Sequence, residues 1–344
     1  MDLSKIFLMI LIPFIFVVFI VPFVKKLAIQ VGAVDVPGGR HIHSKPTPKL
    51  GGLALFAGFL LGYMLFGEHS AQMNSILIGS FIILMTGIID DIVTLRPGVK
   101  FVGQLLSALV IAVYGGILLS KLSAFGIKIN FGLFAYPLTI FFIVGCINCM
   151  NLIDGLDGLS GGISSIYFLM VGVIATIQGK NGLDFVLTFV MLGSTLGFLV
   201  HNFPPAKIFA GDSGSNFLGF IIAIIALLGF KNVTLTSLIV PLLLIAIPIL
   251  DTLFAILRRM IKGQPISKAD NYHIHHQLLN KKLNAKQVVL IIYLVDLLFA
   301  VASLIYVLKD KYLGYIIYGV LLAIVIVFVL NTSVIYEKKN KNSE

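Results

Sequence analysis

The chain has 344 residues, of which 58% are hydrophobic and only 12% charged, and its mean hydropathy is +1.05. A soluble domain carries roughly 25% charged residues, so the composition excludes an ordinary soluble globular protein. The formal net charge of +10 does not indicate nucleic-acid binding, because the sequence has no soluble basic module to carry it.

Apolar runs near 20 residues recur along the chain, and each is long enough to cross roughly 30 Å of hydrocarbon as a helix. They do not alternate polar and apolar residues as the strands of a membrane barrel would. We therefore predict an all-α, polytopic membrane protein with one transmembrane domain over residues 1–344. The eleven predicted spans are 3–24, 50–67, 75–89, 101–119, 137–153, 159–178, 185–201, 215–230, 237–257, 287–308 and 313–331.

Lys and Arg are distributed unevenly between the two sides that these spans define. With the N-terminus outside, most of the 25 Lys and Arg residues lie in inside loops and in the basic tail 331–344. The positive-inside rule then predicts an outside N-terminus and a cytoplasmic C-terminus. The long polar segments 25–49 and 258–286 are inside. The outside connection 120–136 alternates around Ile127 and Ile129, which indicates a small hairpin on the membrane surface.

Five aspartates fall at the inside ends of predicted spans: Asp90, Asp91, Asp154, Asp157 and Asp212. A carboxylate at membrane depth is costly and is usually functional. Acids that merely mark helix ends would explain one pair, but not three clusters on the same side of the membrane. We therefore predict a functional site where these clusters meet.

The neighbours of these acids indicate phosphate and metal chemistry. Asn148, Asn151 and Asp154 recur at intervals of three, so they share roughly one helix face. The glycines of the "DGLDG" segment let the backbone turn and let a ligand approach closely. Asp and Asn oxygens suit Mg²⁺, whose shell substrate phosphates often complete. In "GDSGS", Asp212 and small residues begin the next span, where a helix N-terminus favours an anion.

The two long inside segments supply basic residues. One contains "GGRHIHSKPTPKLGG", which includes Lys45, and the other contains "NYHIHHQLLN". The histidines of the second segment could belong to an ordinary polar loop or to a structural zinc site, although both cysteines lie inside a span and could not complete such a site. We interpret His273, His275 and His276 as partners of a pyrophosphate or a sugar.

Four further residues lie inside predicted spans. Cys146 and Cys149 lack the polar setting that a redox pair or a metal site needs, so we predict that they are small buried residues. Asp251 precedes Arg258 by about two helical turns. It is either half of an internal salt bridge or an anchor for the inside substrate loop. Asp296 has no assigned role.

Five motifs in this order resemble those of the polyprenyl-phosphate N-acetylhexosamine-1-phosphate transferases, glycosyltransferase family 4. They are "PTPKLGG", "IIDD", "NxxNxxDGxDGL", "GDSGS" and "HIHH". The family includes bacterial enzymes that start wall teichoic acid and O-antigen assembly, and the translocase that makes lipid I. The resemblance implies transfer of a sugar-1-phosphate from a UDP-sugar to a polyprenyl phosphate, with release of UMP. It also implies a bacterial plasma membrane and an active site that faces the cytoplasm.

The resemblance also implies roles for individual residues at the reaction centre. Asp90 resembles the base that removes the proton of the lipid phosphate, with Asp91 beside it. Asp154 resembles a further essential carboxylate. Asp212, with Asn151, resembles the Mg²⁺ site that bridges the nucleotide pyrophosphate, where Mn²⁺ could substitute.

Other matched positions correspond to substrate contacts. The positions that form the uridine pocket are Gly155, Leu156, Asp157, Asn202 and Phe209, and Lys45 and Asn148 lie near them. His273, His275 and His276 match the loop that contacts the pyrophosphate and the sugar.

The layout favours one branch of this family. The predicted eleven spans, the basic tail, "HIHHQLL" and "PILDTLFAILRR" resemble the N-acetylglucosamine branch. That branch implies UDP-N-acetylglucosamine as donor, undecaprenyl phosphate as acceptor and, from the family, a homodimer. The alternatives are the muramyl-pentapeptide donor of lipid I synthesis and, from another class, an ion-coupled transporter. A transporter predicts acids near the bilayer midplane, whereas these acids lie at one interface.

Overall fold

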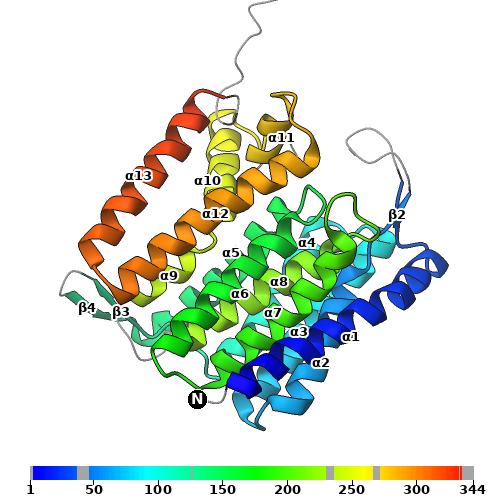
Figure 1. Cartoon of the computed structure of the whole chain (residues 1–344), viewed down its shortest axis with the longest axis horizontal. Helices are drawn as coiled ribbons and strands as arrows, with labels where there is room; N and C mark the ends of the chain where they lie inside the picture. The colour runs from blue at the N-terminus through cyan, green and yellow to red at the C-terminus, as the bar shows by residue number, and fades with distance from the viewer. Residues whose placement is uncertain are drawn as a thin grey trace, which may run out of the picture.

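The computed structural model describes residues 3–36, 46–124, 127–229, 236–265, 272–332 and 334, and these are mostly helical. The predicted all-α membrane fold is confirmed (Figure 1). The α-helices are α1 (Leu3–Gln30), α2 (Gly51–Phe66), α3 (Ala71–Val93), α4 (Pro97–Leu109), α5 (Ala135–Ile153), α6 (Leu159–Ile177), α7 (Leu183–Asn202), α8 (Gly211–Gly229), α9 (Thr236–Leu243), α10 (Ala246–Ile261), α11 (Ile274–Leu279), α12 (Ala285–Leu308) and α13 (Lys311–Leu330).

Nine helices in the described segments are long and apolar enough to cross a membrane. One of the nine, Pro97–Tyr114, joins α4 to the π-helical turn Val110–Tyr114, and another, Gly132–Ile153, joins the 3-10 turn Gly132–Phe134 to α5. Helix α2 is apolar but has only 16 residues. The chain is therefore a polytopic membrane protein.

The predicted span 237–257 is not one helix, because the chain breaks between α9 and α10 at Leu244 and Ile245. Pro248 explains the break. In a continuous helix its ring would clash with the carbonyl of Leu244 and its missing N–H would remove one bond of the ladder. In α10, Pro248 instead occupies the first turn, where backbone N–H groups have no partner inside the helix.

Two short hairpins interrupt the helical fold. Strands β3 (Lys121–Ala124) and β4 (Ile127–Asn130) pair antiparallel with Lys121 opposite Asn130, which confirms the hairpin predicted within 120–136. Strands β1 (Val34–Asp35) and β2 (Thr47–Pro48) pair within the first polar segment, where we predicted no strand.

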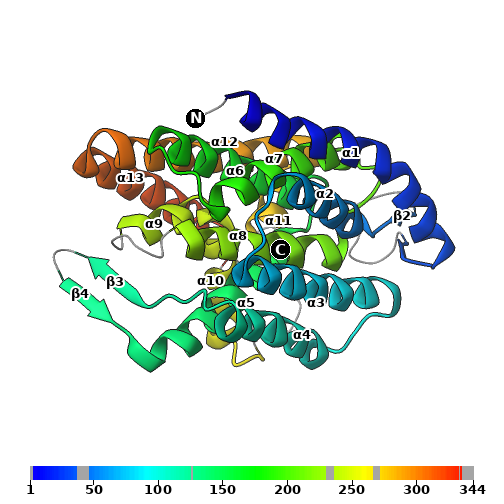
Figure 2. The ribbon, with the colours of Figure 1, turned by 90° about the horizontal axis from the view of Figure 1, so that it is seen from below.

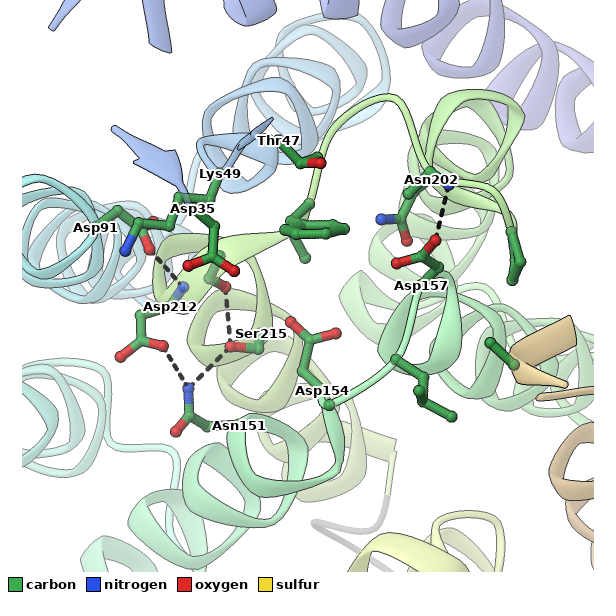
Figure 3. Close-up of a pocket in the computed structure, with 18 of the residues that line it drawn as sticks. Asp35, Thr47, Lys49, Asp91, Asn151, Asp154, Asp157, Asn202, Asp212 and Ser215 are labelled. Carbon is green, nitrogen blue, oxygen red and sulfur yellow. Dashed lines mark hydrogen bonds between the residues drawn. The ribbon is translucent and has the colours of Figure 1, made fainter. Parts of the chain in front are cut away.

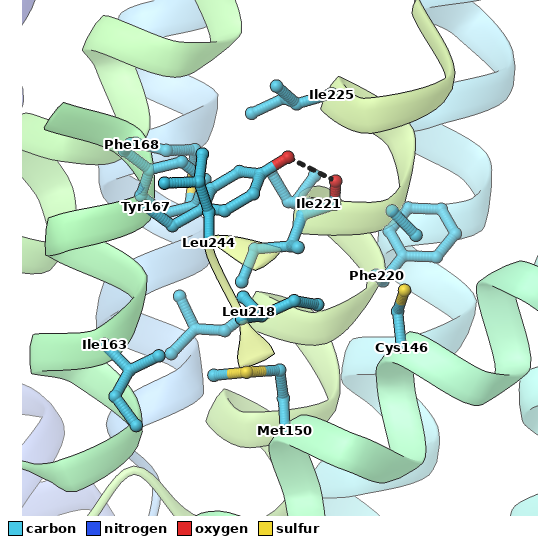
Figure 4. Close-up of a cluster of buried hydrophobic side chains, with 14 of the residues drawn as sticks. Cys146, Met150, Ile163, Tyr167, Phe168, Leu218, Phe220, Ile221, Ile225 and Leu244 are labelled. Atoms are coloured by element: carbon cyan, nitrogen blue, oxygen red, sulfur yellow. Dashed lines mark hydrogen bonds between the residues drawn. The ribbon is translucent and has the colours of Figure 1, made fainter. Parts of the chain in front are cut away.

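Helix α8 forms the centre of the bundle and contacts α2, α3, α5, α6 and α7 (Figures 1 and 2). Its apolar side chains are almost entirely buried, and Figure 4 shows Leu218 and Ile221 packed with Tyr167 of α6 and Met150 of α5. The Tyr167 hydroxyl donates to the Ile222 carbonyl at 3.2 Å.

Close packing around α8 depends on small residues, as is usual in membrane bundles. A Cβ at Gly87 of α3 would lie 2.4 Å from the Cα of Ser213, so only glycine lets the end of α3 approach the start of α8 this closely. Cys146 and Cys149 of α5 are buried and not bonded to each other, as predicted. This packing brings the ends of α3, α5 and α8 together.

Candidate active site

A cavity of about 920 Å³ lies where these helix ends meet (Figure 3). Its walls come from β1 and β2, the end of α3, the loop after α5, the segment between α7 and α8, and the start of α12. The predicted site residues that line it are Asp90, Asp91, Asn151, Asp154, Gly155, Leu156, Asp157, Asn202, Phe209, Asp212 and His276. Three separate polar clusters of the sequence thus form one cavity.

Asp91 binds the first turn of α8 through both of its carboxylate oxygens. Oδ1 accepts from the backbone N–H of Asp212 at 2.9 Å, and Oδ2 accepts from that of Ser213 at 3.1 Å. Gly211 adopts φ +71°, and a Cβ there would lie 2.5 Å from Asp91 Oδ2. With only 4% of Asp91 exposed, this carboxylate holds the backbone that carries Asp212.

Asp90, the neighbour of Asp91, has different partners. Its Oδ1 accepts from the backbone N–H of Leu95 at 2.6 Å, and its Oδ2 lies 2.5 Å from the Lys100 ammonium. The same ammonium lies 2.6 Å from Asp212 Oδ2. Lys100 of α4 therefore bridges carboxylates of α3 and α8.

Asn151, near the end of α5, orients Asp212 from the opposite side. Its amide donates to Asp212 Oδ1 at 3.1 Å and to the Ser215 hydroxyl at 3.0 Å (Figure 3). Ser215 in turn donates to the Gly211 carbonyl at 3.0 Å. Asp212 is thus held by an amide on one oxygen and by an ammonium on the other.

Asp154 ends α5 and faces the centre of the cavity in Figure 3. Its Oδ1 accepts a hydrogen bond of 2.6 Å from the Ser160 hydroxyl. Burial raises the pKa of this carboxyl to about 8, because a charge there loses its hydration. The nearby carboxylates of Asp212, Asp91 and Asp157 raise the pKa further, while the Ser160 bond opposes them. Burial of Asp154 therefore favours its protonated form.

Asp157, Asn202 and Phe209 form another wall of the cavity. Asp157 Oδ2 accepts from the backbone N–H of Ala206 at 2.8 Å, and Asn202 donates to the Ile208 carbonyl at 2.8 Å. Both side chains thus hold the loop that leads from α7 to α8. The buried amide oxygen of Asn202 has no hydrogen-bond partner among the described residues.

The segment around β2 is joined to this wall by main-chain bonds. The N–H of Phe209 donates to the Pro48 carbonyl at 2.8 Å, and the N–H groups of Gly51 and Gly52 donate to the carbonyls of Phe209 and Ala210, each at 3.0 Å. The "PTPKLGG" and "GDSGS" motifs are therefore neighbours in space.

Three of the predicted site residues that the structure describes lie away from the cavity wall. Asn148 lies one turn deeper in α5, where its amide donates to the Gln104 side chain and to the Val144 carbonyl, each at 2.8 Å. His273 and His275 lie behind the wall, and only His276 of the three histidines lines it. Lys45 lies outside the described residues.

The oxygen-rich donor set fits a hard divalent cation. No group of three or more His, Cys, Asp or Glu side chains in the described segments is arranged as a closed metal site. Asp90 and Asp212 nevertheless converge on one cation, the Lys100 ammonium. Mg²⁺ is commonly bound by one or two carboxylates, with substrate phosphates completing its shell, so the residues present fit such an ion.

Several cavity residues were not among the predicted site residues: Asp35, Thr47, Lys49, Ser215, Asn284 and Lys286 line the wall, and Lys100 bridges two of its carboxylates. Lys100 had a signal in the sequence, because it is a basic residue in the short inside connection that follows Asp90 and Asp91. Lys286 had the same kind of signal, because it is a basic residue of the inside segment 258–286. Asn284 had none, because only the tertiary fold brings the start of α12 to this cavity.

The model for glycosyl transferase family 4 matches residues 73–230. A probable undecaprenyl-phosphate N-acetylglucosaminyl 1-phosphate transferase of Bacillus subtilis is 41% identical over 296 residues, which are 84% of this chain and 81% of that protein. The chain belongs to glycosyl transferase family 4. The family 4 match contains Asp90, Asp91, Asp154 and Asp212, and it ends before the histidine segment.

Other relatives of this family 4 protein carry related names. A decaprenyl-phosphate N-acetylglucosaminephosphotransferase of Mycobacterium tuberculosis is 33% identical over 302 residues, with 79% of this chain and 75% of that protein covered. An undecaprenyl-phosphate alpha-N-acetylglucosaminyl 1-phosphate transferase of Salmonella typhi is 30% identical over 286 residues, with 81% and 78% covered. These matches support the predicted N-acetylglucosamine branch of family 4.

Proposed function

We propose that this protein transfers N-acetylglucosamine-1-phosphate from UDP-N-acetylglucosamine to undecaprenyl phosphate and releases UMP. The product, undecaprenyl-pyrophosphoryl-N-acetylglucosamine, would begin a cell-wall glycopolymer. The cavity would face the cytoplasm of a bacterial plasma membrane. The observation that carries the proposal is the convergence of Asp90, Asp154 and Asp212 in one cavity of a membrane bundle, with Lys100 bridging two of these carboxylates.

In the proposed reaction, an oxygen of the lipid phosphate attacks the β-phosphorus of the donor. A new P–O bond forms the lipid pyrophosphate, and the bond between the β-phosphorus and the bridging oxygen breaks, so that UMP leaves with that oxygen. Phosphoryl transfer of this kind depends mainly on positioning and on neutralising charge. The cavity residues would serve both needs.

Cations would neutralise the phosphate charges. Lys100 supplies one positive charge between Asp90 and Asp212. Mg²⁺, for which Mn²⁺ would be a substitute, would be held by Asp212, with Asn151 orienting that carboxylate, and would polarise the pyrophosphate oxygens. Ion binding in this position would require Lys100 to leave its bridging contact and would free its ammonium for a phosphate.

The aspartates would divide the work according to their partners. Asp91 is committed to two backbone N–H groups of α8, so we assign it to holding Asp212. Asp90 faces Lys100 at the cavity wall, which suits a base close to the lipid phosphate. A phosphate monoester is already largely ionised near neutral pH, so this base has a modest task. The wall of Asp157, Asn202 and Phe209 would bind the uridine.

The experiment is a UMP-release assay on the full-length protein in nanodiscs, with Mg²⁺, undecaprenyl phosphate and one UDP-sugar at a time. We expect release with UDP-N-acetylglucosamine. Release only with the muramyl-pentapeptide donor would move the protein to the lipid I branch, and no release with any donor would refute the enzyme proposal.

A matched pair of variants tests the metal position. Asp212→Asn should abolish turnover and remove Mg²⁺-dependent binding of UDP. Asp184→Asn, at the far end of α7 from Asn202 and about 27 Å away at 1.5 Å per residue, should leave both unchanged. If UDP binding by Asp212→Asn still depended on Mg²⁺, Asp212 would be excluded as a ligand of the ion. The homodimer expected from the family would be tested by measuring the mass of the detergent-solubilised protein, with the detergent contribution subtracted.

A further inference from the structure

Helix α10 is joined to the start of α11 by a buried carboxylate. Asp251 is 1% exposed. Its Oδ2 lies 2.6 Å from Nδ1 of His273, and its Oδ1 accepts from the backbone N–H of Ile274 at 2.7 Å. Of the two roles that the sequence left open for Asp251, the structure thus shows the anchor of the histidine segment.

A second contact from the same face of α10 reaches the same segment. Arg258, two turns beyond Asp251, donates to the carbonyl of Tyr272 at 3.4 Å, and its guanidinium lies 5.4 Å from the centre of the Tyr272 ring. Helix α11 has only six residues, too few for a helix that is stable by itself. Its position therefore depends on anchors such as Asp251.

The three histidine rings connect this anchor to the cavity. The rings of His273 and His275 are parallel within 5° and their centres are 5.6 Å apart, while the centres of His275 and His276 are 4.3 Å apart. His275 is 1% exposed and packs against Gly155, where a Cβ would lie 2.4 Å from its Nε2. His276 is the ring that lines the cavity. A displacement of His273 would thus pass through His275 to the cavity wall.

The hydrogen bond from His273 to Asp251 sets the protonated nitrogen of the His273 ring as well as its position. A carboxylate that accepts from Nδ1–H fixes the ring orientation and leaves the proton on Nδ1, as carboxylates that hydrogen-bond to metal-bound and catalytic histidines do. Because the other oxygen holds the Ile274 N–H, one side chain sets both the rotation of the ring and the direction of α11.

We propose that Asp251 is a positioning residue for the transfer reaction: by binding His273 and the first N–H of α11, it places His276 on the cavity wall. The inference rests on the proposed function, since it assigns Asp251 a part in that reaction. Asp251 acts through the histidines and does not itself touch the substrate.

The test is Asp251→Asn in the full-length protein in nanodiscs. The Asn oxygen can still accept from Ile274, but its amide then faces Nδ1, so the ring must lose the bond or change tautomer. We expect kcat for UMP release to fall about 10- to 100-fold, which is typical when a carboxylate that orients a functional histidine is lost. Calorimetric binding of UMP should be unchanged, because UMP lacks the pyrophosphate that the histidines would contact and the proposed uridine wall is separate. Wild-type kcat in this variant would overturn the proposal.

A double-mutant cycle separates positioning from a general structural role. If Asp251 acts through His273, the variant that combines Asp251→Asn with His273→Gln should lose no more activity than the more damaged single variant. Losses that multiply would overturn the proposal. If Asp251→Asn does not fold, His273→Gln must show the same selective loss of kcat with UMP binding retained.

Asp296→Asn is the matched control, because Asp296 is a buried carboxyl on the neighbouring α12 and its oxygens have no hydrogen-bond partner among the described residues. It should leave kcat unchanged, and an equal loss would overturn the proposal. Nitrogen NMR of histidine-labelled protein should report a tautomer change in Asp251→Asn only. The NMR signal does not depend on turnover. If the wild-type protein released no UMP, the proposed function would be refuted, and the Asp251–His273 contact could still be measured by NMR.

Discussion

Replacing Gly155 by alanine tests how closely the loop after Asp154 must approach α11. The added Cβ would lie 2.4 Å from Nε2 of His275 and 2.8 Å from its Cε1. An ordinary contact needs at least 3.4 Å, so the imidazole must retreat by about 1 Å. The ring is 1% exposed and its centre lies 4.3 Å from that of His276, so the displacement passes to α11 and His276. A misplacement of about 1 Å can slow an enzyme roughly 100-fold, which corresponds to about 2.7 kcal/mol of transition-state stabilisation.

The assay compares kcat for UMP release in nanodiscs between the wild type, Gly155→Ala and Gly145→Ala. Gly145 lies on α5, and a Cβ there would meet nothing within 4 Å, so this variant should retain full activity. Thermal unfolding of the three proteins separates a displaced site from a loss of fold. Wild-type kcat in Gly155→Ala would show that His275 can move without consequence and would refute the reasoning.

Three further predictions concern stability and protonation. Asp91→Ala leaves two buried N–H groups without an acceptor, each costing about 1–3 kcal/mol, so its melting temperature should fall further than that of Asp91→Asn; equal values would contradict the capping role. The protonated-carboxyl infrared band of Asp154 should disappear as pH rises through about 8. As pH rises from 3.8 to 8, the wild type should lose stability relative to Asp154→Asn, because in this range only the folded state keeps the proton on Asp154. A midpoint near 3.8 would contradict this. Gly162→Ala would place a Cβ 1.9 Å from the Tyr293 ring and should cost about 1–3 kcal/mol, whereas Gly319→Ala, with open space around it, should cost little; equal melting temperatures would refute the close contact.

The convergence of the acids was predictable because two sequence signals combine. Hydrophobic runs locate the helix ends, and the Lys and Arg asymmetry assigns those ends to sides of the membrane. Asp90, Asp154 and Asp212 therefore fall on one side before any packing is known, and the structure brings them to one cavity. Their separate contacts were not predictable, since the capping of α8 by Asp91 requires the close approach of α3 at Gly87.

The remaining differences arise where packing or backbone geometry overrides hydropathy. Hydropathy alone joins 237–257 into one span, whereas Pro248 divides it into α9 and α10. Lys100 was recognised only as an inside charge, because its bridge depends on the packing of α4 beside α3 and α8. The histidines were predicted as one group, yet their stacking leaves only His276 on the wall, and sequence spacing does not reveal such an order.

The main-chain bonds between the β2 segment and the residues before α8 have a consequence for altering specificity. They join Pro48, Gly51 and Gly52 to Phe209 and Ala210 through backbone atoms alone. The side chain of Phe209 can therefore be exchanged without breaking the ladder that supports the chain leading to Asp212. Phe209 differs in this respect from Asp157 and Asn202, whose side chains hold the same loop, so Phe209 is the position of the proposed uridine wall at which a change of side chain would leave these main-chain bonds in place.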